Sequence, residues 1–176
     1  MKTSIKGLVE LAGLEGVCLQ PYLDSVGVVT IGVGATRSEI PGLSLAHRDI
    51  TVAEAIDLFK TSIVRYENAV NKALSVPVTQ EQFDALTSIC YNIGVGGLAK
   101  STFIKRINAN DTKARIAAAI MMWNKPKEIM GRRAKEAKLF TEGVYSNGGK
   151  ALLFPADEKG RVNYSKGKTI NIEDYL

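Results

Sequence analysis

Hydrophobic positions recur at helical spacing along most of the chain, which predicts a protein that is largely helical. The clearest pattern runs from 51 to 75, where apolar residues alternate in steps of three and four. Thr51 and Glu54 form a capping-box signature at its start, so we expect one long helix there. Shorter helices are predicted over 4–14, from Thr79 to Ile93, after N-caps at Ser101 and Asp111, and over 127–142.

Two further segments carry many turn-forming residues. In residues 15–50, glycine and proline punctuate β-favouring runs such as VVTIGV, which predicts a small twisted hairpin or a three-stranded sheet. Residues 144–176 also contain scattered glycine and proline among apolar residues. We expect irregular structure or short strands there, laid over the helical body.

These elements together predict an α+β fold. A long helix joins a small β-hairpin lobe to a larger helical lobe and leaves a cleft between them, which is a common location for a ligand site. We expect a single domain over 1–176. Its parts are the small β lobe (13–50), the interlobe helix (51–75), the helical lobe (1–12 and 76–143) and a C-terminal extension packed on the body (144–176).

The composition is that of an ordinary folded domain with a modest positive charge. Of the 176 residues, 45% are hydrophobic, and 23 Lys and Arg against 18 Asp and Glu give a net charge of +5. This excess favours anionic partners such as nucleic acid, acidic lipid surfaces or bacterial wall polymers. No run approaches the roughly 18 apolar residues of a membrane span, and Glu10 and Glu15 interrupt the apolar start. We therefore expect neither a transmembrane anchor nor a signal peptide.

Cysteine and histidine are too scarce for several kinds of catalytic site. Cys18 and Cys90 are the two cysteines, so there is no disulfide framework and no CxxC metal pair. His47 is the one histidine, which leaves a single candidate for Ser-His-Asp or Cys-His catalysis and argues against a zinc site. We expect no metal and no organic cofactor.

The strongest chemical signal is a pair of acids near the N-terminus. Glu15 ends the first predicted helix, Asp24 lies at the edge of a turn, and Thr30 lies on a predicted strand. Two carboxylates beside a cleft can hydrolyse a glycosidic bond, because one protonates the leaving oxygen and the other handles water or the developing positive charge. The apolar neighbours of Glu15 favour its protonated form, as a general acid requires. The alternative is that both are ordinary surface acids, with Asp24 shaping a turn beside Gly27.

Several motifs extend this signal along the chain. Glu15, eight residues, Asp24, five residues and Thr30 are followed by Ile-Gly-Val-Gly. The other matching segments are IT-x-x-EA at 50–55, QFDALTSICYNIG at 82–94, STFIKRINAND at 101–111, Trp123, and GRRAKE at 131–136. Over residues 5–142 this series resembles the phage-type lysozymes, the endolysins of glycoside hydrolase family 24.

The resemblance implies a lysozyme-like fold and a muramidase activity. The substrate would be the β-1,4 bond between N-acetylmuramic acid and N-acetylglucosamine in peptidoglycan. Glu15 would be the general acid, and Asp24 and Thr30 would place the attacking water or stabilise the transition state. The alternative on the same substrate is a lytic transglycosylase, which forms a 1,6-anhydro product without using water.

Five other residues are candidates for substrate binding or support. By resemblance, Asn92 hydrogen-bonds an N-acetyl group, although a structural role at a helix end is an equal alternative. Tyr22, which could instead be a core residue, and Gly34 complete the predicted substrate contacts. Arg132 and Arg133 lie in a basic cluster, and the resemblance implies that one of them pairs with Glu15 or supports the cleft. The sequence does not choose between the two arginines.

The resemblance also implies partners and a place of action. The chain would act as a monomer on peptidoglycan strands, without stable membrane insertion. It would accumulate in the host cytoplasm until a holin releases it to the cell wall. The remote alternative is a basic helical module that binds nucleic acid through residues 125–138, but no known reading motif occurs there. We therefore expect no nucleic-acid partner.

Overall fold

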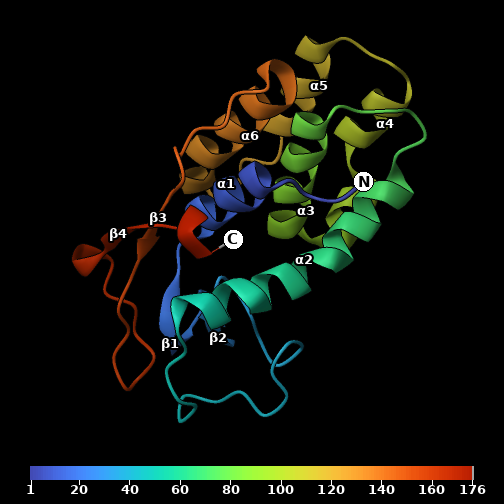
Figure 1. The fold of residues 1–176 in the computed structure, drawn as a ribbon. Coiled ribbons are helices and arrows are strands. Elements are labelled where there is room, and N and C mark those ends of the chain that lie inside the picture. Colours follow the sequence, from blue (N-terminus) through green and yellow to red (C-terminus); the bar gives the residue numbers. More distant parts are fainter. Residues whose placement is uncertain (176) are drawn as a thin grey trace. The chain divides into compact units, whose positions relative to one another are not determined.

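The computed structural model describes residues 1–175, and the fold mixes helices with small antiparallel sheets (Figure 1). Within that range the α-helices are α1 (Ile5–Glu15), α2 (Val52–Ala73), α3 (Gln80–Lys100), α4 (Thr102–Asn108), α5 (Lys113–Met121) and α6 (Met130–Glu142). The strands are β1 (Cys18–Leu23), β2 (Val29–Gly32), β3 (Lys150–Leu153) and β4 (Lys168–Asn171). Short 3-10 turns are η1 (Lys127–Ile129), η2 (Tyr164–Lys166) and η3 (Glu173–Tyr175). The predicted α+β class is confirmed.

The chain divides into two compact units. The first, which we call the helical unit, contains Met1–Leu8 and Ile63–Ser146. The second, which we call the hairpin unit, contains Val9–Ser62 and Asn147–Leu176. Helices α1 and α2 each contribute residues to both units. The finer division into lobes stays a prediction.

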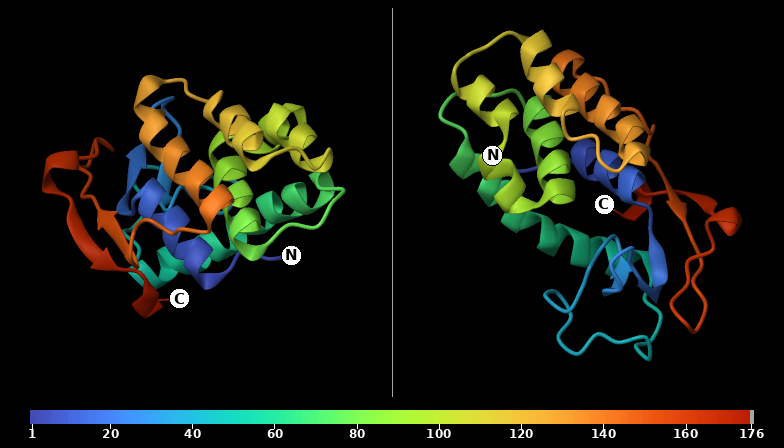
Figure 2. Two further views of the ribbon diagram at one scale, coloured as in Figure 1. Left: turned by 90° about the horizontal axis from the view of Figure 1, so that it is seen from above. Right: turned by 180° about the vertical axis from the view of Figure 1, so that it is seen from behind.

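The helical unit is built around one apolar core. Helix α6 packs beside α3 and α5, as Figure 2 shows. Fully buried members of this core include Phe83, Leu86, Ile89, Phe103 and Ile120. Helix α3 begins after Thr79, as the sequence predicts, and it starts with a capping box: the Thr79 hydroxyl accepts from the Gln82 N–H, and the Gln82 side chain accepts from the Thr79 N–H at 2.9 Å. None of the helices within residues 1–175 has both the length and the apolar composition to span a bilayer.

Two helix boundaries in this unit differ from the sequence pattern. Helix α3 continues to Lys100 past a break at Gly94 (φ 77°, ψ 162°), although the glycines predict an end near there. Helix α5 is capped by Thr112 rather than by Asp111. The reason is that the Asp111 carboxylate accepts a hydrogen bond at 2.6 Å from Arg106, and its other oxygen accepts from the Thr112 N–H at 2.8 Å.

The hairpin unit contains both sheets. Strands β1 and β2 form a two-stranded antiparallel hairpin, in which Tyr22 lies opposite Thr30, and no third strand joins it within the described residues. Strands β3 and β4 form a second antiparallel pair from the C-terminal extension (144–176). The Val17 N–H donates to the Leu152 carbonyl and the Phe154 N–H donates to the Val17 carbonyl, each at 2.8 Å. The extension is therefore hydrogen-bonded to the segment that leads into β1 (Figure 2).

Candidate active site

Glu15 is placed by the end of α1. It is the last helical residue, and Gly16 follows at φ 77°, the left-handed conformation that commonly ends a helix. The Gly16 N–H donates to the Ala12 carbonyl at 2.9 Å, and the chain then turns into β1. The Glu15 side chain is half-buried and lines a small pocket of about 40 Å³. The other lining residues are Gly16, Val17, Cys18, Tyr22, Phe154, Val162 and Tyr164.

Replacing Gly16 by alanine should lower the free energy of unfolding by about 2–3 kcal/mol, because two penalties combine. A side chain at φ 77° strains the backbone, and a Cβ at this position would lie 2.9 Å from Cε2 of Phe154. Gly27 is a matched control, since it has φ 81° but no atom within 4 Å of a built Cβ. In urea unfolding, Gly27→Ala should therefore lower the free energy of unfolding only by the part that comes from backbone strain. Equal losses in the two variants would contradict a tight contact between Gly16 and the Phe154 ring.

Asp24 follows β1 and holds the turn that leads into β2. Its Oδ1 atom accepts hydrogen bonds from the N–H groups of Val26 (2.9 Å) and Val28 (2.8 Å). The Asp24 N–H in turn donates to the Val28 carbonyl at 3.0 Å. Within residues 1–175, Oδ2 makes no hydrogen bond. One oxygen of the Asp24 carboxylate thus holds the turn, which agrees with the alternative that Asp24 shapes a turn. The other oxygen is available to a ligand or water.

Tyr22 and Thr30 belong to the two strands of the hairpin. They are opposite each other across β1 and β2, so their side chains lie on one face of the hairpin. Thr30 is buried, and its hydroxyl donates to the Val28 carbonyl at 3.0 Å. Burial raises the pKa of the Tyr22 phenol, and the nearby Cys18, Glu15, Tyr164 and Asp24 raise it further. The phenol therefore stays protonated beside both carboxyl groups.

Gly34 belongs to the tight turn that follows β2. The backbone groups of Ile31 and Ala35 exchange two hydrogen bonds of 2.9 Å around this turn. Gly34 has φ 85°, a conformation that favours glycine. A structural reason for glycine is therefore present at this position, and its contact with substrate stays a prediction.

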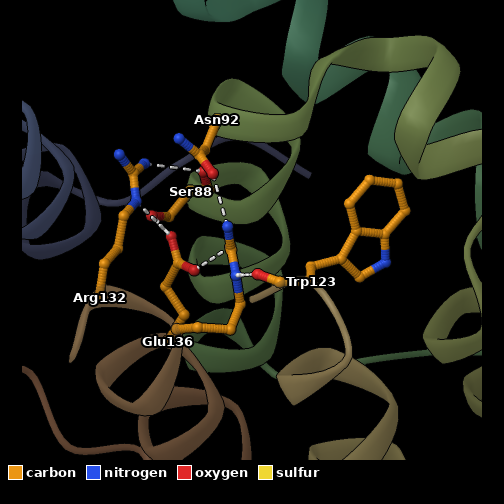
Figure 3. Close-up of polar contacts among 6 residues, drawn as sticks. Ser88, Asn92, Trp123, Arg132 and Glu136 are labelled. Atoms are coloured by element: carbon orange, nitrogen blue, oxygen red, sulfur yellow. Dashed lines mark hydrogen bonds and ion pairs between the residues drawn. The ribbon is translucent and has the colours of Figure 1, made fainter. Parts of the chain in front are cut away.

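Arg132 and Arg133 lie in the helical unit, where both bind the carboxylate of Glu136 (Figure 3). The Arg132 Nε donates to Glu136 Oε1 at 2.9 Å, and the Arg133 Nη1 donates to Oε2. The Ser88 hydroxyl also donates to Oε1, at 2.6 Å. The side chains of Arg133 and Glu136 are each 1% exposed. Burial lowers the pKa of the Arg133 guanidinium, and the Glu136 carboxylate opposes that shift.

The same network fixes Asn92. Its side chain is exposed, and its Oδ1 atom accepts a hydrogen bond from Arg133 Nη2 at 2.5 Å. The Arg133 Nε donates to the Trp123 carbonyl at 3.1 Å, which anchors the same guanidinium from another side (Figure 3). Asn92 is therefore oriented by a buried cation while its Nδ2 donors face outward. The predicted sugar contact of Asn92, and the predicted pairing of one arginine with Glu15, stay predictions.

Glu136 and Phe154 are the site residues that the sequence reasoning missed. Glu136 follows Arg133 by three residues and Arg132 by four. These are the spacings at which ion pairs form along a helix, so the sequence contained a signal for this contact. Phe154 has no comparable signal, because its place in the Glu15 pocket depends on pairing with a distant strand segment.

Two further features of the described residues concern metal ligands and thiols. Within 1–175, no three or more His, Cys, Asp or Glu side chains are grouped to hold a metal ion. Cys18 and Cys90 are buried free thiols, as expected. Burial raises the pKa of the Cys18 thiol and raises that of Cys90 to about 12, so both stay protonated near neutral pH.

The chain is similar to known proteins in sequence and in fold. The profile of the phage lysozyme family matches residues 12–136. The endolysin of Salmonella phage P22 is 36% identical over 145 residues, which cover 80% of this chain and 98% of the relative. A solved endolysin from Escherichia coli O157:H7 phage FAHEc1 is similar with a TM-score of 0.78 and 38% identity, over 84% of this chain and 98% of that one.

A third similarity reaches outside the phages. The muramidase domain of SpmX from Asticaccaulis excentricus has a TM-score of 0.71 and 29% identity, over 79% of this chain and 97% of that one. The family match includes Glu15, Asp24, Thr30, Asn92 and both arginines, and it ends ahead of the C-terminal extension. The resemblance seen in the motifs is thus confirmed, and this chain belongs to the phage lysozyme family.

Proposed function

We propose that this chain is an endolysin that hydrolyses the β-1,4 bond between N-acetylmuramic acid and N-acetylglucosamine in peptidoglycan. The observation that carries this proposal is the convergence of Glu15, Tyr22, Asp24 and Thr30 within the hairpin unit. Two acids flank one short strand there, one in a pocket and one anchored in a turn. Membership of the phage lysozyme family and similarity to a structure described as a muramidase domain support the same assignment.

In this proposal, Glu15 delivers a proton to the glycosidic oxygen as the bond to the anomeric carbon breaks. The sugar left behind carries oxocarbenium-like positive charge. Asp24 is held by two backbone N–H groups, and its other oxygen makes no hydrogen bond within residues 1–175, so it stabilises this charge or orients the attacking water. The water oxygen bonds to the anomeric carbon and the water loses one proton, to Asp24 or to solvent. Solvent then returns a proton to Glu15, so one water is consumed for each bond cleaved. The Thr30 hydroxyl lies beside this path on the same hairpin.

The products test this chemistry directly. Digestion of purified peptidoglycan should release muropeptides with reducing ends, because hydrolysis adds water across the bond. Mass spectrometry would detect a lytic transglycosylase instead, since its 1,6-anhydro product is lighter by one water. A pure anhydro product would reject hydrolysis while leaving the peptidoglycan substrate in place.

We propose that the chain meets its substrate as a monomer and waits in the host cytoplasm until a holin opens the inner membrane. Several of its relatives are named endolysins and others SAR-endolysins, which supports a role in host lysis. The net charge of +5 favours contact with anionic wall components, an attraction that salt weakens. No nucleic-acid partner enters this proposal.

A further inference from the structure

A groove of about 300 Å³ lies in the hairpin unit between β1 and the C-terminal extension. Leu19 from β1 and Leu153, Phe154 and Pro155 from the extension give it apolar walls. Lys166, at the end of η2, and Lys168, at the start of β4, also line it. The groove therefore combines an apolar surface with two ammonium groups.

Hydrogen bonds fix both sides of the groove. Gln20, which also lines it, accepts a hydrogen bond from the Ala156 N–H through Oε1 at 3.4 Å. The Nε2 of Gln20 donates to Asp49 Oδ2 at 2.8 Å, so its amide is already engaged at both ends. The Phe154 N–H donates to the Val17 carbonyl at 2.8 Å. The extension is thus held against β1 in a defined register rather than by apolar contact alone.

The groove adjoins the pocket of the proposed catalytic acid. Phe154 lines both the groove and the Glu15 pocket. Its ring is close enough to Gly16 and Gly167 that a Cβ on either would approach it to 2.9 Å and 2.7 Å. Tyr164 packs on it edge-on, with ring centroids 5.2 Å apart. Phe154 is therefore the residue that the groove and the Glu15 pocket share.

The charge of the groove is positive and unneutralised. Both lysines are exposed, and within residues 1–175 neither forms an ion pair. In contrast, Arg161 of the same extension pairs with Asp157 at 2.6 Å. Among the described residues, no acidic side chain lines the groove. Two free ammonium groups above an apolar wall suit a ligand that carries carboxylates on a short aliphatic backbone.

We propose that this groove binds the peptide stems of the glycan strand, with Lys166 and Lys168 pairing with stem carboxylates. The inference rests on the proposed muramidase function, because N-acetylmuramic acid carries a peptide of small aliphatic and carboxylate-bearing residues beside the bond that is cleaved. The extension would then make the enzyme favour glycan strands that carry peptides. Phe154 would be the shared wall between peptide and glycosidic bond.

The test compares two substrates for each variant: peptidoglycan with its stems, and glycan strands from which an amidase has removed the stems. For Lys166→Ala/Lys168→Ala, the ratio of kcat/KM on stem-bearing to stem-free strands should fall about tenfold at low salt, through KM. Lys150→Ala/Lys159→Ala is the matched control. It removes the same charge from exposed positions of the extension that do not line the groove, and it should keep the wild-type ratio.

The outcomes separate the two proposals. An unchanged ratio in the groove variant, or an equal fall in the control, would overturn the peptide groove and leave the muramidase function standing. An equal loss on both substrates would also overturn it, because general attraction to the wall would then explain the lysines. The muramidase function is tested separately by the products: it fails if the muropeptides released from both substrates carry only 1,6-anhydro ends, whatever the lysines do.

Discussion

Replacing Glu15 by glutamine should lower the rate of peptidoglycan cleavage by about a hundredfold to ten-thousandfold, the usual contribution of a general acid. Glutamine has nearly the same shape, so the half-buried position at the wall of the small pocket is kept. The amide, however, has no acidic proton to give to the glycosidic oxygen. The loss should therefore appear in kcat, with little change in KM.

The measurement is the loss of turbidity of chloroform-treated Gram-negative cells, together with the release of reducing ends from purified peptidoglycan. Circular dichroism and the unfolding midpoint report whether the variant keeps its fold. Glu158→Gln is a suitable control, because Glu158 is exposed in the C-terminal extension and lines neither the pocket nor the groove. A folded Glu15→Gln enzyme that clears cells at the wild-type rate would reject Glu15 as the acid.

The sequence was sufficient to predict features that depend on residues close together in the chain. Thr79 and Gln82 specify a capping box within four residues, and Ser101 caps α4 as its position predicts. The spacing of Glu15, Asp24 and Thr30 likewise spans one helix end and one hairpin. Once the chain forms that hairpin, these residues have little freedom to separate. The acid pair was nevertheless proposed because this spacing resembles the phage-type lysozyme motif, since the spacing alone left open that Asp24 only shapes a turn.

The parts that escaped prediction depend on contacts between distant segments. Phe154 reaches the Glu15 pocket only because Val17 and Leu153 form a bridge between segments far apart in the chain. The basic residues after Lys125 suggest a solvated helix face, yet Arg133 is 1% exposed. Its burial is set by Glu136 on the same helix and by Asn92 from α3. Periodicity reports which side of a helix is apolar, but it does not report that a charge is neutralised inside the core.

Glu136 should be the most sensitive charged position for stability. Replacing it by glutamine should lower the free energy of unfolding by about 3–5 kcal/mol, because it removes the carboxylate that neutralises the buried Arg133 guanidinium. The Arg133 side chain is 1% exposed, so water cannot replace the lost carboxylate. Glu142→Gln is the control. Glu142 pairs with Lys138 at 3.9 Å with both side chains more than half exposed, and its loss should cost less than about 0.5 kcal/mol.

Urea unfolding of both variants measures the difference, and a loss of less than about 1 kcal/mol in Glu136→Gln would contradict a neutralising role. The double variant Arg133→Met/Glu136→Leu separates charge from packing. It removes the most deeply buried cation together with its counter-ion, so it should recover at least half of the stability lost in Glu136→Gln. Because Arg133 also orients Asn92, this variant should still bind peptidoglycan more weakly than the wild type, with a higher KM. Recovered stability with unchanged KM would show that Asn92 does not need its buried partner.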